Sequence, residues 1–240
     1  MPSKWKQTVI KTFDGGAKHY DQNNEIQIKT ADTLISLAPT IENPSILEIG
    51  CGTGTLTQKL IKHYPDATFH ITDISEKMLK TAQCQCPSNT AIQWGLMDGE
   101  KPNHLKSYDI IISNMAFQWF ETPEQSIKSL TKHLNPNGSL LYSVPASNSF
   151  KQWRSTLSGL SLPYGFKNHT QWPDITKEEA ITIDYKTTRN FLKTLKAIGA
   201  STPTQNYKRL SFTQLQQACA HNDQKNGGQT TWNIQYGHYK

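Results

Sequence analysis

Short apolar runs alternate with amphipathic segments over the first 145 residues, and this alternation predicts an α/β fold. Five runs have the length and apolar character of strands, and they lie at 46–49, 67–72, 91–95, 108–114 and 139–144. Helices are expected between them at 55–63, after Ser75, and at 123–134, where apolar residues recur every three or four positions. Strands that alternate with helices predict a mostly parallel sheet covered on both faces.

Residues 1–38 predict a helical arm ahead of this sheet. Phe13 and Tyr20 mark its apolar side, and Pro39 ends its last helix. Because glycine weakens a helix, Asp14-Gly15-Gly16 is expected to interrupt the arm and to form a mobile joint. Tyr20 either packs within the arm or delivers its hydroxyl over a bound cofactor.

The alternation breaks at residues 146–179, where aromatic residues and cations are concentrated. A long irregular segment rich in aromatic residues predicts an inserted cap over a functional site. Beyond it, a strand at 180–185, helices at 188–198 and 211–221, and an alternating edge strand at 231–236 complete the pattern. We expect one domain, 1–240, divided into the arm (1–38), a core (39–145), the cap (146–179) and C-terminal elements (180–240).

Three glycines follow the first strand at a spacing of two, in the sequence Glu48-Ile49-Gly50-Cys51-Gly52-Thr53-Gly54. In a strand–loop–helix turn of this kind, a nucleotide-like ligand lies against the backbone without meeting a Cβ atom. The spacing differs from the G-x-G-x-x-G pattern of dinucleotide-binding proteins, and the Gly-Lys-Ser/Thr sequence of a P-loop is missing. Glu48 would repel a pyrophosphate and attract a ligand that carries an amino group.

Acidic residues follow the next two strands. Asp73 lies 19 residues after Gly54, at a strand end where a carboxylate takes both hydroxyls of a ribose. Asp98 can accept from the exocyclic amine of an adenine, or it can simply form a turn before Gly99. Met78 either packs in the core or lies against the bound nucleoside.

Composition narrows the partners. The net charge is +6, carried mostly by lysine, which fits an acidic partner or a solvated surface. The sequence contains no basic run with interleaved aromatic residues, so nothing in it predicts nucleic-acid binding. Four cysteines without a paired C-x-x-C spacing predict free thiols and no metal site. No apolar run spans a membrane and the N-terminus lacks a signal-peptide pattern, so a cytoplasmic protein is expected.

Leu47 to Gly54, followed by Asp73-Ile74-Ser75, resembles the first two motifs of class I S-adenosylmethionine-dependent methyltransferases. The resemblance implies a Rossmann-like, seven-stranded, mostly parallel sheet with a late antiparallel edge strand, and S-adenosylmethionine as cofactor. The expected cofactor-binding residues are Tyr20, Glu48, Gly50, Cys51, Gly52, Gly54, Asp73, Ile74, Met78, Asp98, Gly99, Asn114 and Met115.

Further stretches narrow the resemblance. Phe13 with Tyr20, the pair Gln118-Trp119, and residues 191–200 are similar to the malonyl-acyl-carrier-protein O-methyltransferases of biotin synthesis. The resemblance implies methyl transfer to the free carboxylate of malonate held as a thioester on acyl carrier protein or coenzyme A. An aconitate-type methyltransferase of small diacids and a non-catalytic cofactor-binding protein are the alternatives. Gly15-Gly16 departs from the helix formers that the family more often has.

Such a reaction needs no general base, because a carboxylate with a reference pKa of about 4 is already anionic at pH 7. We therefore expect no catalytic side chain and a mechanism of positioning. The cap, Tyr20, Gln118 and Trp119 are expected to form the substrate chamber. Arg154 is the candidate cation for the carboxylate, or else a solvated helix residue. The carrier is expected to dock on the cap at Lys151, Arg154 and Lys167.

Overall fold

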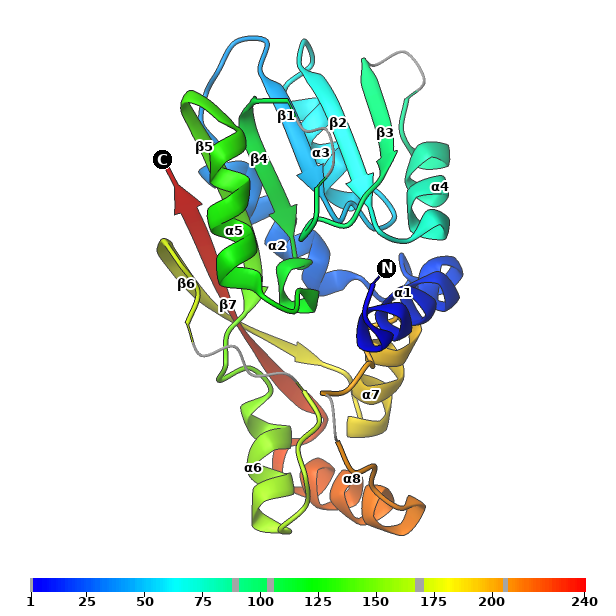
Figure 1. Cartoon of the computed structure of the whole chain (residues 1–240). Helices are drawn as coiled ribbons and strands as arrows, with labels where there is room; N and C mark the ends of the chain where they lie inside the picture. The colour runs from blue at the N-terminus through cyan, green and yellow to red at the C-terminus, as the bar shows by residue number, and fades with distance from the viewer. Residues whose placement is uncertain (1, 88–90, 103–105, 167–170, 205–206) are drawn as a thin grey trace.

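The computed structural model describes residues 2–87, 91–102, 106–166, 171–204 and 207–240. Its centre is a seven-stranded sheet with the strand order β3-β2-β1-β4-β5-β7-β6 (Figure 1). The strands are β1 (Ser45–Ile49), β2 (Thr68–Asp73), β3 (Ile92–Leu96), β4 (Tyr108–Asn114), β5 (Leu134–Pro145), β6 (Ile175–Asp184) and β7 (Gln229–Tyr239). Strands β1 to β5 are parallel, and β7 is antiparallel to both of its neighbours. The expected mostly parallel sheet is confirmed.

Helices cover both faces of this sheet and also lie beyond the carboxyl ends of its parallel strands (Figure 1). They are α1 (Lys4–Gly16), α2 (Glu25–Leu37), α3 (Thr55–His63), α4 (Glu76–Gln85), α5 (Pro123–Leu130), α6 (Lys151–Gly159), α7 (Thr188–Ala197) and α8 (Phe212–Asn226), with 3₁₀ turns η1 (Ala17–His19), η2 (Phe117–Trp119) and η3 (Thr131–His133). Successive residues of a strand point to opposite faces, so Ile110 and Ile112 pack with α2 and α3, and Ile111 packs with α5. The helix expected after Ser75 is α4, and Ser75 caps its N-terminus by accepting from the Met78 backbone N–H at 3.2 Å.

The carboxyl ends of the parallel strands define where a site can form. Figure 1 shows β1, β2 and β4 pointing toward α1, with α6, α7 and α8 gathered at the end of the molecule beyond it. Ligands of open α/β sheets bind outside these strand ends. The arm and the C-terminal helices therefore close over the edge at which the glycine loop lies.

Several predicted boundaries are wrong. Strand β6 begins at Ile175, so the last five residues of the predicted cap belong to the sheet, and the cap's one described helix is α6. The predicted edge strand, β7, lies between β5 and β6, and β6 is the edge. The alternation at 231–236 suggested one exposed face, but a sheet neighbour on each side buries most of β7.

Strand β5 is also longer than predicted, because it begins at Leu134. Residues 135–138 bulge out of the ladder, between the pairs Tyr108–Leu134 and Ile110–Ser139. The helix expected over 123–134 accordingly ends at Leu130 and continues only as the turn η3.

The predicted break at Asp14-Gly15-Gly16 is wrong, because α1 is helical through Gly16. The reason is a close approach of backbones. A Cβ on Gly16 would lie 2.7 Å from the Ala197 carbonyl oxygen at the end of α7, and a Cβ on Gly199 would lie 2.8 Å from the Phe13 Cα atom. Glycine here joins the arm to the C-terminal half of the chain instead of loosening it.

Two neighbouring glycines of α1 test this contact. A Cβ on Gly15 meets nothing within 4 Å. We expect Gly15→Ala to stabilise the protein by about 0.5–1 kcal/mol, the ordinary gain of alanine over glycine in a helix. Gly16→Ala should instead destabilise it by about 1–3 kcal/mol, the cost of overpacking. Urea denaturation of both variants measures the difference, and equal shifts of the same sign would contradict the close packing of α1 on α7.

Candidate active site

The glycine loop between β1 and α3 brings backbone to the edge of a cavity. Gly50, Gly52 and Gly54 have φ angles of +73°, +55° and +95°, which favour glycine. A Cβ on Gly52 would meet only the Tyr20 ring, at 3.9 Å, whereas one on Gly54 would lie 3.2 Å from Ala82 of α4. Gly52 is thus the loop position at which a ligand can lie against the main chain, and Gly54 serves helix packing.

Most of the expected cofactor-binding residues line one cavity beside this loop. They are Tyr20, Gly50, Gly52, Asp73, Ile74, Met78, Asp98, Gly99, Asn114 and Met115. The structure places Glu48, Cys51 and Gly54 outside its lining. A cradle of bare backbone at Gly52 with a carboxylate at the next strand end suits a nucleoside, so these residues fit S-adenosylmethionine.

Asp73 lies at the floor of this cofactor cavity and is 7% exposed. Its Oδ2 accepts from the Gly52 backbone N–H at 2.8 Å, and its Oδ1 accepts from the Ser75 N–H at 2.8 Å. Burial raises the pKa of Asp73 to about 6, although these backbone donors oppose the shift. Each carboxylate oxygen keeps a second lone pair, which a ribose hydroxyl can use.

Glu48 lies beneath the loop and not in the cavity. It is 1% exposed, and its Oε2 accepts from the Thr57 hydroxyl at 2.6 Å. Burial raises its pKa to about 8, so Glu48 is protonated at neutral pH. In this state it supports the loop as a neutral hydrogen-bonding group and carries no charge to attract an amino group.

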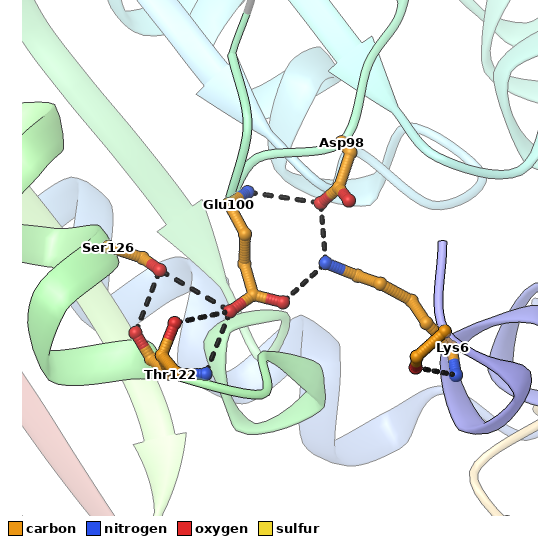
Figure 2. A network of polar contacts seen from close by, with 6 residues as sticks. Lys6, Asp98, Glu100, Thr122 and Ser126 are labelled. Carbon is orange, nitrogen blue, oxygen red and sulfur yellow. Dashed lines mark hydrogen bonds and ion pairs between the residues drawn. The ribbon is translucent and has the colours of Figure 1, made fainter. Parts of the chain in front are cut away.

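A buried ion cluster lies beside the cofactor cavity, which Lys6 and Asp98 line, and Figure 2 shows its contacts. The ammonium of Lys6, from α1, contacts Asp98 Oδ1 at 2.5 Å and also Glu100 Oε2. Glu100 Oε1 in turn accepts from the Thr122 backbone N–H at 2.8 Å, at the start of α5. Burial alone would raise the pKa of Glu100, but hydrogen bonds from Lys6 and from backbone N–H groups lower it overall. Asp98 therefore meets the arm as well as the cavity.

The four expected substrate residues, Tyr20, Gln118, Trp119 and Arg154, line a second cavity. This substrate chamber shares Phe13, Tyr20, Met115 and Trp119 with the cofactor cavity, so these side chains stand between the two. Phe13 and Trp119 meet edge to face, with ring centroids 5.4 Å apart. A group transferred between the cavities has to pass this aromatic partition.

Tyr20 is the polar member of the partition. Burial, then the nearby Asp73 and Asp21, raise the pKa of its phenol, while a hydrogen bond with Gln27 lowers it. The net shift is upward, so Tyr20 is neutral at pH 7 and presents a hydroxyl. Gln27 is itself buried at 6% exposure, and its Oε1 has no hydrogen-bond partner in the structure. The pair offers polar atoms at the boundary of the two cavities.

Arg154 is the one charged side chain among the described residues that line the chamber. Its guanidinium carbon lies 4.2 Å from the centre of the Tyr164 ring, and its Nη2 donates to the Tyr164 hydroxyl at 3.2 Å. Burial raises the pKa of Tyr164 to about 12, and the guanidinium opposes this shift. Because Tyr164 accepts from arginine, its own proton is available to an anion. Arg154 thus lines the chamber and is only partly exposed, which contradicts the solvated alternative.

The cap supplies part of the chamber wall, as expected, but sequence reasoning missed Lys6 and the apolar residues that reach the chamber from outside the cap. Lys6 lies three positions before Val9 and seven before Phe13, on the apolar side of α1. A lysine on the apolar side of a helix was the sequence signal that could have indicated a buried ion pair. Leu195 and Ile198 reach the chamber from α7, which only the folded chain brings there.

Other predictions concern surfaces and metals. Lys151 is exposed at the start of α6, and Lys167, also predicted to meet the carrier, lies outside the described residues. The cysteines at 51, 84, 86 and 219 are free, as expected. Within the described ranges, no helix is both long and apolar enough to cross a bilayer, and no three His, Cys, Asp or Glu side chains gather around a metal position.

Comparison with known proteins defines the family. A methyltransferase-domain model matches residues 47–140. The chain is 32% identical to the malonyl-[acyl-carrier protein] O-methyltransferase of Halalkalibacterium halodurans, over 82% of this chain and 83% of that protein. It is 29% identical to the Magnetococcus marinus protein of the same name, over 96% of this chain and 91% of that protein. The fold matches that of the putative methyltransferase solved with the Haloferax volcanii Trm112 activator. The TM-score is 0.60 and the sequence identity 15%, over 95% of this chain and 96% of that protein.

The fold and the cofactor cavity define a class I S-adenosylmethionine-dependent methyltransferase. Within this class the chain belongs to the malonyl-[acyl-carrier protein] O-methyltransferase family. The family resemblance and the expected cofactor are thereby confirmed.

Asp73 predicts a pH dependence of cofactor binding. Ribose hydroxyls donate to a carboxylate, so the cofactor selects the ionised form, which prevails above the pKa of about 6 and is lost below it. The dissociation constant of S-adenosylmethionine should rise about tenfold from pH 7 to pH 5, as one proton competes with the ligand. Glu48, with a pKa of about 8, stays protonated at both values. Calorimetry on the wild type and on Asp73→Asn measures this; a wild-type affinity independent of pH would remove Asp73 from ribose binding.

The ion cluster of Lys6 is expected to hold α1 against the cofactor cavity. Lys6→Met leaves Asp98 and Glu100 side by side without a cation, and loss of one partner of a buried pair costs about 3–5 kcal/mol. We expect faster hydrogen exchange along α1 and weaker binding of S-adenosylmethionine. Lys4→Met, at an exposed position of the same helix, is the matched control. Equal exchange in both variants would show that the cluster does not hold the arm.

Proposed function

We propose that this enzyme transfers the methyl group of S-adenosylmethionine to the free carboxylate of a malonyl group carried by acyl carrier protein. Both relatives compared above bear the name of this activity. The observation that carries the proposal is the chamber itself: an apolar, aromatic cavity beside the cofactor cavity whose described lining includes Arg154 as its one charge.

The chamber suits a carboxylate that leaves water. An anion that enters an apolar space needs fixed donors to replace its hydration. The guanidinium of Arg154, which lies over the Tyr164 ring, brings a positive charge to the chamber, and the neutral hydroxyls of Tyr164 and Tyr20 supply hydrogen-bond donors.

The reaction requires the protein to position the two reactants and to exclude water from between them. S-adenosylmethionine supplies an activated methyl group when bound. A malonyl carboxylate is ionised at neutral pH, so no proton has to be removed, and the raised pKa of Tyr20 keeps that residue a donor and not a base. Holding two reactants in line contributes up to about 7–11 kcal/mol in well-oriented systems. Phe13 and Trp119 exclude water at the point where the two ligands would meet.

Substrate choice tests the proposal directly. The purified enzyme is assayed for methyl transfer to malonyl-acyl carrier protein, malonyl-coenzyme A, free malonate and aconitate. We expect the highest kcat/KM for the carrier-bound thioester. Faster transfer to a free diacid would establish the aconitate-type alternative, and binding of S-adenosylmethionine without transfer to any acid would establish a binding protein.

Arg154 is tested by a conservative change. Arg154→Lys keeps the charge and removes the paired donors and the stack on Tyr164. We expect kcat/KM for the malonyl thioester to fall about 10- to 100-fold, the value of one or two hydrogen bonds to a charged group. Affinity for S-adenosylmethionine should stay unchanged, because Arg154 lies outside the cofactor cavity.

The exposed Arg189 of α7 supplies the matched control, since Arg189→Lys makes the same change away from both cavities. Unchanged turnover of Arg154→Lys at subsaturating thioester would remove Arg154 from substrate binding.

A further inference from the structure

A third cavity lies beyond the substrate chamber, between α6, α7 and the start of α8. Phe166, Leu195 and Thr202 line both this cavity and the chamber, so these three side chains form the wall between them. The cofactor cavity, the chamber and the third cavity therefore follow one another in series. A long substrate whose carboxylate reaches the cofactor can therefore extend its other end toward the third cavity.

Positive charge is concentrated in the stretches of chain that supply most of the lining of this third cavity. Residues 146–173 and 185–222, which contain α6, α7 and much of α8, carry nine lysine and arginine residues and no aspartate or glutamate. The whole chain has a net charge of +6, so the rest of the molecule is net negative. Lys196 and Arg209 are exposed and line the third cavity itself. This end of the molecule, at which Figure 1 shows α6, α7 and α8 together, attracts an acidic partner.

Exposed apolar side chains accompany these charges. Phe212 is 71% exposed at the first position of α8, and Leu215, one turn later on the same face, is 36% exposed and lines the third cavity. Large apolar side chains that stay exposed next to a cavity mark a contact surface. Cations around an apolar centre are the arrangement that a protein partner of opposite charge would recognise.

We infer that an acidic carrier protein docks over Lys196, Arg209, Phe212 and Leu215, and that its prosthetic arm enters through the third cavity. The inference rests on the proposed function for the identity of the carried group. The arm crosses the wall at Phe166, Leu195 and Thr202 and places the malonyl group in the chamber. This surface on α7 and α8 differs from the cap surface expected from the sequence, because Arg154 of that cap lines the chamber.

Charge reversal at the cavity mouth is the main test. Lys196→Glu with Arg209→Glu is compared with Lys128→Glu with Lys132→Glu, which makes the same change in net charge at exposed positions of α5 and η3. Fluorescence anisotropy measures binding of the carrier protein without its malonyl group, at low and high salt. We expect the first double variant to bind at least about tenfold more weakly at low salt, with a flatter salt dependence, and the control to bind like wild type.

Steady-state kinetics on two thioesters distinguish a loss of carrier docking from a change in the shape of the chamber. The first double variant should show a KM for malonyl-acyl carrier protein raised about tenfold, with kcat retained, because complementary charge acts mainly on association. Malonyl-pantetheine, which lacks both the carrier and its phosphate, should lose distinctly less kcat/KM than malonyl-acyl carrier protein, because it has no carrier surface for these cations to attract. Phe212→Ser, at a mostly exposed position, should also weaken carrier binding but should keep its salt dependence.

Equal losses on the two thioesters, or equal effects of the two double variants, would overturn the docking surface. Failure of the wild type to methylate any malonyl thioester would overturn the proposed function instead. The anisotropy measurement needs no methyl transfer, so it still decides whether the carrier binds at α7 and α8.

Discussion

Closure of the N-terminal arm over the carboxyl edge of the sheet is the contact on which both cavities depend. Polar groups tie the arm to three strand ends: Asp21 accepts from the Thr53 hydroxyl at 2.5 Å, Asp14 accepts from the Ser75 hydroxyl at 2.5 Å, and Lys6 contacts Asp98. The arm also supplies Phe13 and Tyr20 to the partition. Without it, the glycine loop would face solvent and the chamber would lack a wall.

Burial explains the perturbed groups of the site. Burial is the largest cause of the raised pKa values of Asp73, Glu48 and Tyr20. Neutral Glu48 supports the loop through Thr57, and neutral Tyr20 remains a donor, so neither acts as a base. An enzyme that abstracts a proton would need such a group poised near neutrality in contact with the nucleophile. Transfer to a carboxylate has no such requirement.

The sequence predicted what local patterns determine. Three features rest on residues that are adjacent in the chain: the turn from β1 through Gly50 and Gly52 to α3, the helix that begins after Ser75, and the strand at 108–114. Contacts between distant segments could not be predicted in this way. Gly16 reads as a helix breaker until Ala197 is seen against it, and β7 reads as an edge strand until β6 is seen beyond it. Leu195 and Lys6 reach their cavities only because the arm and α7 pack together.

The charge at Lys6 has a physical consequence for the arm. An apolar contact between α1 and the sheet would be stabilised by all the surface that it removes from water, and it would resist opening by the same amount. Lys6, Asp98 and Glu100 lose hydration when they meet and regain it when they part, so their net contribution to closure is smaller than their Coulomb attraction. Their geometry nevertheless specifies one closed position, because the ammonium has to satisfy two carboxylates from the β3–β4 connection. An arm held by such a cluster closes in a defined place and can still release a cofactor that binds beneath it.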